Sequence, residues 1–140
     1  MNKFTRILLS FWISFTSPII WAATPEPIDP RESVNFTYEE RLVQTKKLHA
    51  LLKSATSAER LNFFDKSIET IKKLSPEERK SLSEKYREQW KKLSAEQKKE
   101  IKLEYRNYIS SLPEFERKEM KRKRNLMLEF MSPEDIKHWK

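Results

Sequence analysis

The hexapeptide Leu74-Ser75-Pro76-Glu77-Glu78-Arg79 has a counterpart 19 residues further along the chain, Leu93-Ser94-Ala95-Glu96-Gln97-Lys98. The same step in both directions reaches four further hexapeptides of related sequence. Together they give six repeat starts, at residues 36, 55, 74, 93, 112 and 131. A constant spacing with no insertion over six copies is typical of a tandem-repeat protein. We therefore expect residues 36–140 to form one repeat domain.

Each hexapeptide carries the features of a helix start. In a capping box, a Ser or Thr hydroxyl accepts a hydrogen bond from a backbone N–H, and an acid or amide three residues later bonds back to the cap residue. Five such pairs follow the 19-residue step: Thr37/Glu40, Thr56/Glu59, Ser75/Glu78, Ser94/Gln97 and Ser132/Asp135. Ahead of Pro113 we expect the pair one residue earlier, as Ser111 with Glu114. The sequence thus predicts an all-α domain in which every repeat starts a new helix.

Between the caps, apolar residues return at helical spacing, as Leu82, Tyr86 and Trp90 do in the third repeat. Nineteen residues turn an α-helix through five full turns and about 100° more. An unbroken helix would therefore point successive repeats in different directions, and no continuous coiled-coil seam would form. We expect five helices of roughly 16 residues and a short terminal one. A compact bundle and an open, curved array of hairpins both fit, and the high charge content favours the open form.

Residues 1–23 have the three-part layout of a secretory signal peptide. Lys3 and Arg6 form a short basic start, an apolar run follows, and Ala22 and Ala23 end the segment. The apolar run is shorter than the ~20 residues of a membrane-spanning helix and is interrupted by polar residues and a proline. We expect export and cleavage after Ala22 or Ala23.

The composition excludes several kinds of functional site. The chain contains no glycine, which excludes phosphate-binding glycine-rich loops, dinucleotide-binding turns and nucleophile elbows. It also contains no cysteine, which excludes disulfides and thiolate metal sites. In an exported protein, this absence favours the bacterial periplasm over eukaryotic secretion. Loss of Lys3 and Arg6 lowers the net charge from +8 to +6. The proline-rich residues 24–35 are expected to be an extended lead-in.

No arrangement of residues indicates catalysis or metal binding. The two histidines, His49 and His138, lie in different repeats and lack the i, i+4 pairing of a zinc site on one helix. Most carboxylates lie at caps or at helical pairing distance from Lys and Arg, where solvated ion pairs explain them. We therefore expect no enzyme, no metal and no cofactor.

Two groups of residues are candidates for partner binding. Neighbours on a helix diverge by 100°, so a narrow apolar seam cannot take every aromatic side chain. The candidates for a partner-binding surface are Phe63, Tyr86, Trp90, Tyr105 and Tyr108. The candidates for an anion-binding surface are Arg117, Lys118, Lys121, Arg122, Lys123 and Arg124. A core role for the aromatic residues and a solvated face for the basic run are the simpler alternatives.

The segment Trp90-Lys91-Lys92-Leu93-Ser94-Ala95-Glu96-Gln97-Lys98 resembles the W-x-x-L-S-P-E-Q-R repeat of a family of small exported proteobacterial proteins of unknown function. This resemblance covers about residues 70–140 and implies export and a helical architecture, but no activity. Residues 93–97 are also similar to the pentamer of the periplasmic LTxxQ family typified by Spy and CpxP, with Ser in place of Thr. That similarity implies a chaperone-like or envelope-stress role.

Taken together, these patterns predict a periplasmic helical-repeat protein that binds other proteins, either unfolded clients or proteins of the envelope. The alternative is a peripheral envelope protein that docks on anionic lipid or lipopolysaccharide through the basic run. Export argues against nucleic acid as a partner. A homo-oligomer is compatible with the sequence.

The signal-peptide layout gives the first prediction. N-terminal sequencing of the exported protein should begin at Ala23 or Thr24, because the small residues before these positions suit a signal peptidase. A mature chain that still starts at Met1 and fractionates with membranes would contradict the predicted cleavage.

Overall fold

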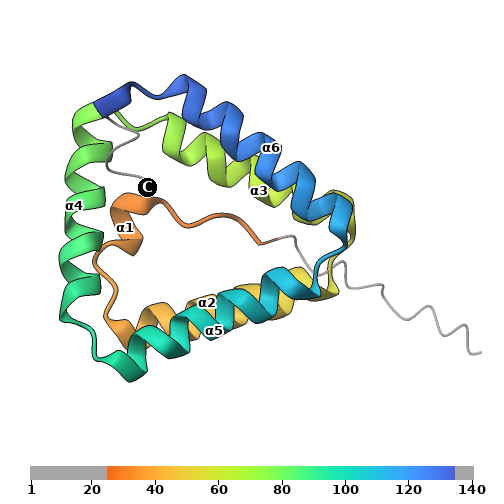
Figure 1. Cartoon of the computed structure of the whole chain (residues 1–140), viewed down its shortest axis with the longest axis horizontal. Helices are drawn as coiled ribbons and strands as arrows, with labels where there is room; N and C mark the ends of the chain where they lie inside the picture. The colour runs from red at the N-terminus through yellow and green to blue at the C-terminus, as the bar shows by residue number, and fades with distance from the viewer. Residues whose placement is uncertain (1–24, 135–140) are drawn as a thin grey trace, which may run out of the picture.

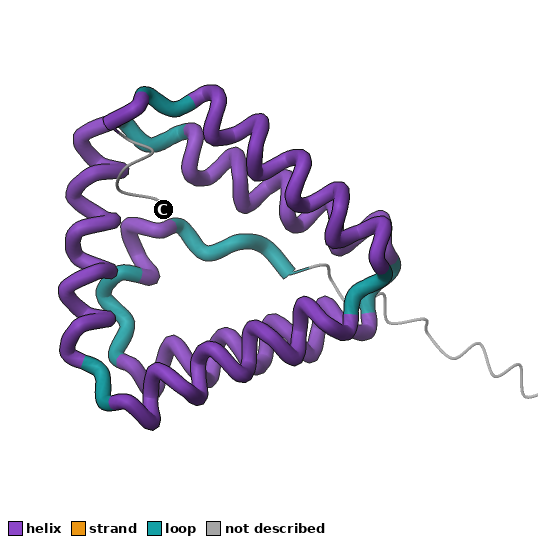
Figure 2. Tube along the Cα trace, viewed as in Figure 1, coloured by secondary structure: helices purple, strands orange, loops and turns teal. Residues whose placement is uncertain are grey.

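The computed structural model describes residues 25–134, which form six helices and no strand (Figures 1 and 2). Five of the helices are long: α2 (Tyr38–Ser54), α3 (Ser57–Lys72), α4 (Pro76–Lys92), α5 (Ala95–Ser111) and α6 (Glu114–Phe130). A short helix, α1 (Pro30–Ser33), precedes them. The predicted all-α fold is confirmed, whereas the predicted signal peptide lies outside the described residues.

Four of the long helices begin at the predicted capping boxes. Their cap residues are Thr37, Thr56, Ser75 and Ser94. At the first of them, Thr37 Oγ1 accepts from the backbone N–H of Glu40 at 3.2 Å, and the Glu40 carboxylate accepts from the N–H of Thr37 at 2.8 Å. These helices therefore start at the predicted 19-residue step.

The start of α6 differs from the prediction. Its N-cap is Pro113, which makes no side-chain hydrogen bond, and the Ser111 hydroxyl donates to the carbonyl of Tyr108 at 2.6 Å instead. The expected Ser111/Glu114 box is therefore wrong. Proline offers neither a side-chain acceptor nor an N–H, so no reciprocal box can form at residue 113. Of the predicted terminal helix, residues 133 and 134 are helical. Asp135, the expected capping partner of Ser132, lies outside the described residues.

The helices wind into a triangular coil (Figure 1). The pairs with extensive contacts are α2 with α5 and α3 with α6, so α2 and α3 each pack on the helix three positions later. The third side of the triangle is α4, and α1 lies inside it. Consecutive helices meet at corners and do not pack as hairpins, because the extended N-cap residue redirects the chain at every cap. The domain is therefore a curved array, but not an array of hairpins.

Contacts between the two turns of the coil join residues at similar sequence separations. His49 bonds to Glu104, Arg60 to Glu116 and Lys123 to Asp65, over 55, 56 and 58 residues respectively. Three repeats of 19 residues make 57, so one turn of the coil contains three repeats. Equivalent faces of the repeats therefore stack on one another, as in other solenoid proteins.

The apolar core is divided into three small clusters. Their buried members are Val34, Leu74 and Leu82; Leu52, Tyr108 and Leu112; and Ile68, Met127 and Met131. The second and third clusters each join a helix of the first turn to a helix of the second. Two of the three clusters are therefore built by packing between the turns.

Residues 30–35 of the lead-in are not extended as predicted. The Asp29 carboxylate caps α1 by accepting from the N–H of Arg31 at 2.8 Å, and Pro30 takes the first helical position. Val34 is only 4% exposed because it packs on α4. The amide of Gln89 donates to the Val34 carbonyl at 2.7 Å. The end of the lead-in therefore covers α4.

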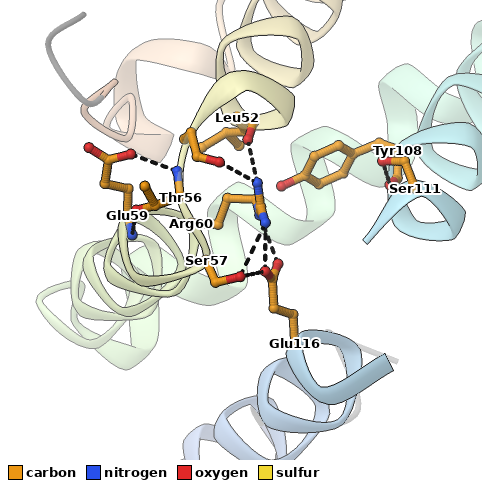
Figure 3. A network of polar contacts seen from close by, with 9 residues as sticks. Leu52, Thr56, Ser57, Glu59, Arg60, Tyr108, Ser111 and Glu116 are labelled. Carbon is orange, nitrogen blue, oxygen red and sulfur yellow. Dashed lines mark hydrogen bonds and ion pairs between the residues drawn. The ribbon is translucent and has the colours of Figure 1, made fainter. Parts of the chain in front are cut away.

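The corner between α2 and α3 is closed by Arg60 (Figure 3). Its guanidinium donates to the carbonyls of Leu52 and Ala55 at the end of α2, at 3.2 and 2.6 Å. It also donates to both carboxylate oxygens of Glu116, at 2.8 and 2.6 Å, and the Ser57 hydroxyl donates to the same carboxylate. Glu116 is fully buried. One arginine thus joins the end of α2, the start of α3 and the first turn of α6.

The environment of this pair favours its charged form. The hydrogen bonds from Arg60 lower the pKa of Glu116 below its ordinary value of 4.5, and the Ser57 hydroxyl adds to this effect against the opposing effect of burial. The carboxylate of Glu116 in turn raises the pKa of Arg60. Both groups are therefore ionised wherever the protein is folded near neutral pH.

The capping boxes and the core clusters give the second prediction. Ser75→Ala should lower the free energy of unfolding by ~1 kcal/mol through loss of the cap. Leu82→Ala should lower it by ~2–5 kcal/mol, because Leu82 is buried in a core cluster. Chemical denaturation followed by circular dichroism measures both. Negligible losses for both variants would show that neither this cap nor the packing of α4 on Val34 and Leu74 stabilises the domain.

The buried pair gives the third prediction. Glu116→Ala should destabilise by ~3–5 kcal/mol, since it leaves the buried face of Arg60 without its carboxylate. The control on the same helix is Glu114→Ala, which removes an exposed pair with Lys118 and should cost at most ~1 kcal/mol. Similar losses for the two variants would contradict the structural role of Glu116.

The same pair predicts a pH dependence. Because the folded pKa of Glu116 is lowered, its contribution is fully present above about pH 4.5 and is lost as the pH falls through the lowered value. The stability difference between wild type and Glu116→Gln should therefore be largest near pH 7 and shrink in acid. A difference that does not change down to pH 3 would refute this contribution.

Candidate binding surface

The structure does not bring the five candidate aromatic residues together as one surface. Tyr108 is 8% exposed and stacks on His49 with 4.2 Å between ring centroids, so its expected role in partner binding is wrong. Phe63 packs against the core cluster that contains Tyr108. Tyr86 is half-buried, and its hydroxyl lies 2.5 Å from that of Ser33. These three side chains build the interior of the coil.

The other two candidates remain accessible. Tyr105 is 50% exposed on α5. Trp90 is half-buried near the end of α4, and the ammonium groups of Lys98 and Lys102 lie 5.9 and 5.7 Å from its ring centroid. Lysines over an indole ring make favourable cation–π contacts. The corner between α4 and α5 therefore carries aromatic and cationic groups together.

The basic run divides into paired and unpaired cations. Lys118 pairs with Glu114 and Arg122 with Glu119 on the same helix, and Lys123 pairs with Asp65 of α3. The remaining three make no ion pair with any described residue: Arg117, Lys121 and Arg124. At spacings of four and three residues, these three lie along one exposed face of α6. Half of the predicted anion-binding residues therefore remain available.

Sequence reasoning missed a second row of cations on α5. A shallow open groove along this helix is lined by Ala95, Lys98, Lys99, Lys102, Leu103 and Arg106. The 19-residue step contained the signal, because Lys98 and Lys102 occupy the repeat positions of Arg117 and Lys121. The basic run drew attention because six of its eight residues are cationic, whereas the cations of α5 are spread over nine residues, from Lys98 to Arg106.

The two rows lie on the same side of the coil. The positions 57 residues before Tyr105, Arg106 and Ile109 are Leu48, His49 and Leu52 of α2, which form part of its interface with α5. On α5, the equivalent residues Tyr105, Arg106 and Ile109 are exposed, and Ile109 is 43% accessible. We call this surface the open face and define it by Lys98, Lys102, Tyr105, Arg106 and Ile109 of α5 and by Arg117, Lys121 and Arg124 of α6. In Figure 1, α5 and α6 lie in front of α2 and α3.

Acidic side chains of α5 point away from the open face. Glu100 accepts from the Tyr38 hydroxyl at 2.7 Å and from Lys46 at 3.1 Å, and Glu104 lies 2.9 Å from His49. The hydrogen bond from Tyr38 lowers the pKa of Glu100, and the same bond raises the pKa of Tyr38 to about 12. Because these acids meet α2, the open face of α5 carries lysine and arginine without a compensating carboxylate.

Other kinds of site receive no support in the described part of the chain. Residues 25–134 contain no group of three or more histidine or carboxylate side chains placed to hold a metal ion. Within the same range, no helix has the length and apolar content needed to cross a membrane.

Comparison with known proteins gives one match. A family described as proteins of unknown function, DUF3106, matches residues 36–138. The match begins at the first repeat and ends within the last one. No curated protein and no solved structure matches the chain, and the similarity to the LTxxQ chaperones stays a prediction. Because the match covers most of its length, the chain belongs to the DUF3106 family of proteins of unknown function.

Proposed function

We propose that this chain is an exported, non-catalytic binding protein of the periplasm whose open face binds other proteins. The observation that carries the proposal is the separation of charge on α5. Its carboxylates Glu100 and Glu104 bond to α2, whereas Lys98, Lys102 and Arg106 face outward. A surface of one charge sign attracts partners of the opposite sign and raises their association rate.

Exposed apolar side chains beside the cations favour a protein partner. Tyr105 and Ile109 lie within the open face, and Leu103 lies next to it with 49% of its surface accessible. Mixed cationic and apolar surface suits weak holding of partly unfolded or envelope proteins, which is a chaperone-like activity. Such holding requires no nucleotide, in keeping with the absence of a glycine-rich phosphate loop.

The alternative is docking on anionic lipid or lipopolysaccharide. It is favoured by the two rows of unpaired cations, which a phosphate-rich surface would also attract. Ionic strength separates the two proposals. Binding to headgroups weakens steeply as salt screens the charges, whereas apolar contacts with a protein persist.

The fourth prediction tests the protein-binding proposal. The mature protein should slow aggregation of a thermally unfolding model client at near-stoichiometric ratio, without ATP, and should retain most of this effect at high salt. Tyr105→Ser combined with Ile109→Ser should weaken it, because both changes remove exposed apolar surface from the open face. Light scattering measures the aggregation.

The matched control is Val43→Ser, which removes a 62% exposed apolar side chain from α2, outside the open face. This variant should behave as the wild type does. Unchanged aggregation at tenfold excess of the protein, together with pelleting on phosphatidylglycerol vesicles at low salt, would exclude client holding and support the lipid alternative.

A further inference from the structure

Two of the polar contacts between the turns share one pattern of position. The third residue of α6, Glu116, bonds to the fourth residue of α3, Arg60. The tenth residue of α5, Glu104, lies 2.9 Å from the twelfth residue of α2, His49. In both contacts the later helix supplies the carboxylate and the earlier helix supplies the basic group. In these two contacts an acid of the later helix meets a base of the earlier helix, whereas the pair between Lys123 of α6 and Asp65 of α3 has the opposite polarity.

On its open face, α5 repeats the pattern of a receiving helix. Lys98 is its fourth residue and Arg106 its twelfth, the positions that Arg60 and His49 hold in α3 and α2. Tyr105 and Ile109 stand where α2 has Leu48 and Leu52, which pack at its junction with α5. The open face of α5 therefore has the features with which a helix of the first turn receives a helix of the second.

We propose that the open face of α5 binds an acidic amphipathic helix of a partner protein, which docks as a further helix of the coil. This inference rests on the protein-binding function proposed above. The helix carries carboxylates at its third and tenth positions, opposite Lys98 and Arg106. Its seventh, fourteenth and eighteenth positions are apolar, as Ile101, Tyr108 and Leu112 are relative to the start of α5. It runs parallel to α5, as α5 runs parallel to α2.

Charge argues against a second copy of this chain as the occupant. The face of α2 that would dock carries Lys47 at its tenth position, where the proposed ligand has a carboxylate. Lys47 would therefore meet Arg106 of the other copy. The carboxylate at the third position, Glu40, is already bonded to the N–H of Thr37 in a capping box. Self-association through these faces would pair like charges.

The fifth prediction uses three fluorescein-labelled peptides, each one repeat long and each with Pro at the N-cap, as in α6, so that no capping box occupies helical position three. The first has Glu at helical positions three and ten and Leu at positions seven, fourteen and eighteen. The second has the same composition, with the two Glu moved to the opposite face. The third has Lys in place of the two Glu. The first peptide should bind the mature protein about tenfold more tightly than either of the others, measured by fluorescence anisotropy.

Charge reversal then identifies the surface. Lys98→Glu combined with Arg106→Glu should lower the affinity for the first peptide by about tenfold and raise the affinity for the third by a similar factor. The matched control, Lys47→Glu with Lys80→Glu, changes the net charge equally at exposed positions outside the open face and should leave the preference for the first peptide unchanged. Circular dichroism melting curves verify that both variants remain folded.

Three outcomes would overturn the inference. Equal affinity for the first two peptides would show that the face attracts anions without helical register. Loss of phosphatidylglycerol vesicle binding in the open-face variant, without any peptide preference, would identify lipid as the occupant. Self-association of wild type, abolished by the same variant in sedimentation equilibrium, would identify a second copy. If client aggregation is still slowed while the peptides do not bind, the proposed function stands and only this inference fails.

Discussion

The bidentate contact between Arg60 and Glu116 is the constraint on which much of the coil depends. Arg60 also binds the last carbonyls of α2, so its guanidinium fixes both the corner between two consecutive helices and the position of a helix one turn later. A buried charge is tolerated only when it is paired and hydrogen-bonded. The pair therefore permits few alternative registers between the turns, and a shift by one residue would separate the two charges.

Glu116 is available for this contact because of a departure from the repeat. In the other four long helices, the residue at the same position closes a capping box. Pro113 cannot complete such a box, so the carboxylate of Glu116 turns toward α3. The irregular helix start and the strongest polar contact between turns thus have one cause. Loss of a local hydrogen bond at α6 is offset by a long-range one.

The same use of carboxylates explains the character of the open face. The carboxylates of Glu100 and Glu104 are directed to α2, and the basic residues at the receiving positions of α5 remain accessible. A terminal repeat needs a polar outer face to stay soluble, but solubility alone does not require a single charge sign. The lysines and arginines of α5 and α6, interspersed with Tyr105 and Ile109, therefore suggest recognition in addition to solubility.

The sequence by itself determined where four of the five long helices begin, because a capping box is a contact between residues three apart and needs no tertiary structure. The sequence also contained the 19-residue period, which places equivalent faces of the repeats on one another after three repeats. The tertiary structure alone decided which faces are covered. Tyr105 and Tyr108 are similar in sequence terms and both rings contact His49, yet Tyr108 stacks on it and is buried, whereas Tyr105 meets it edge-on and stays half exposed. The physical reason is that burial depends on the corner angles between helices, which set which residues 57 positions apart come into contact, and no local pattern encodes those angles.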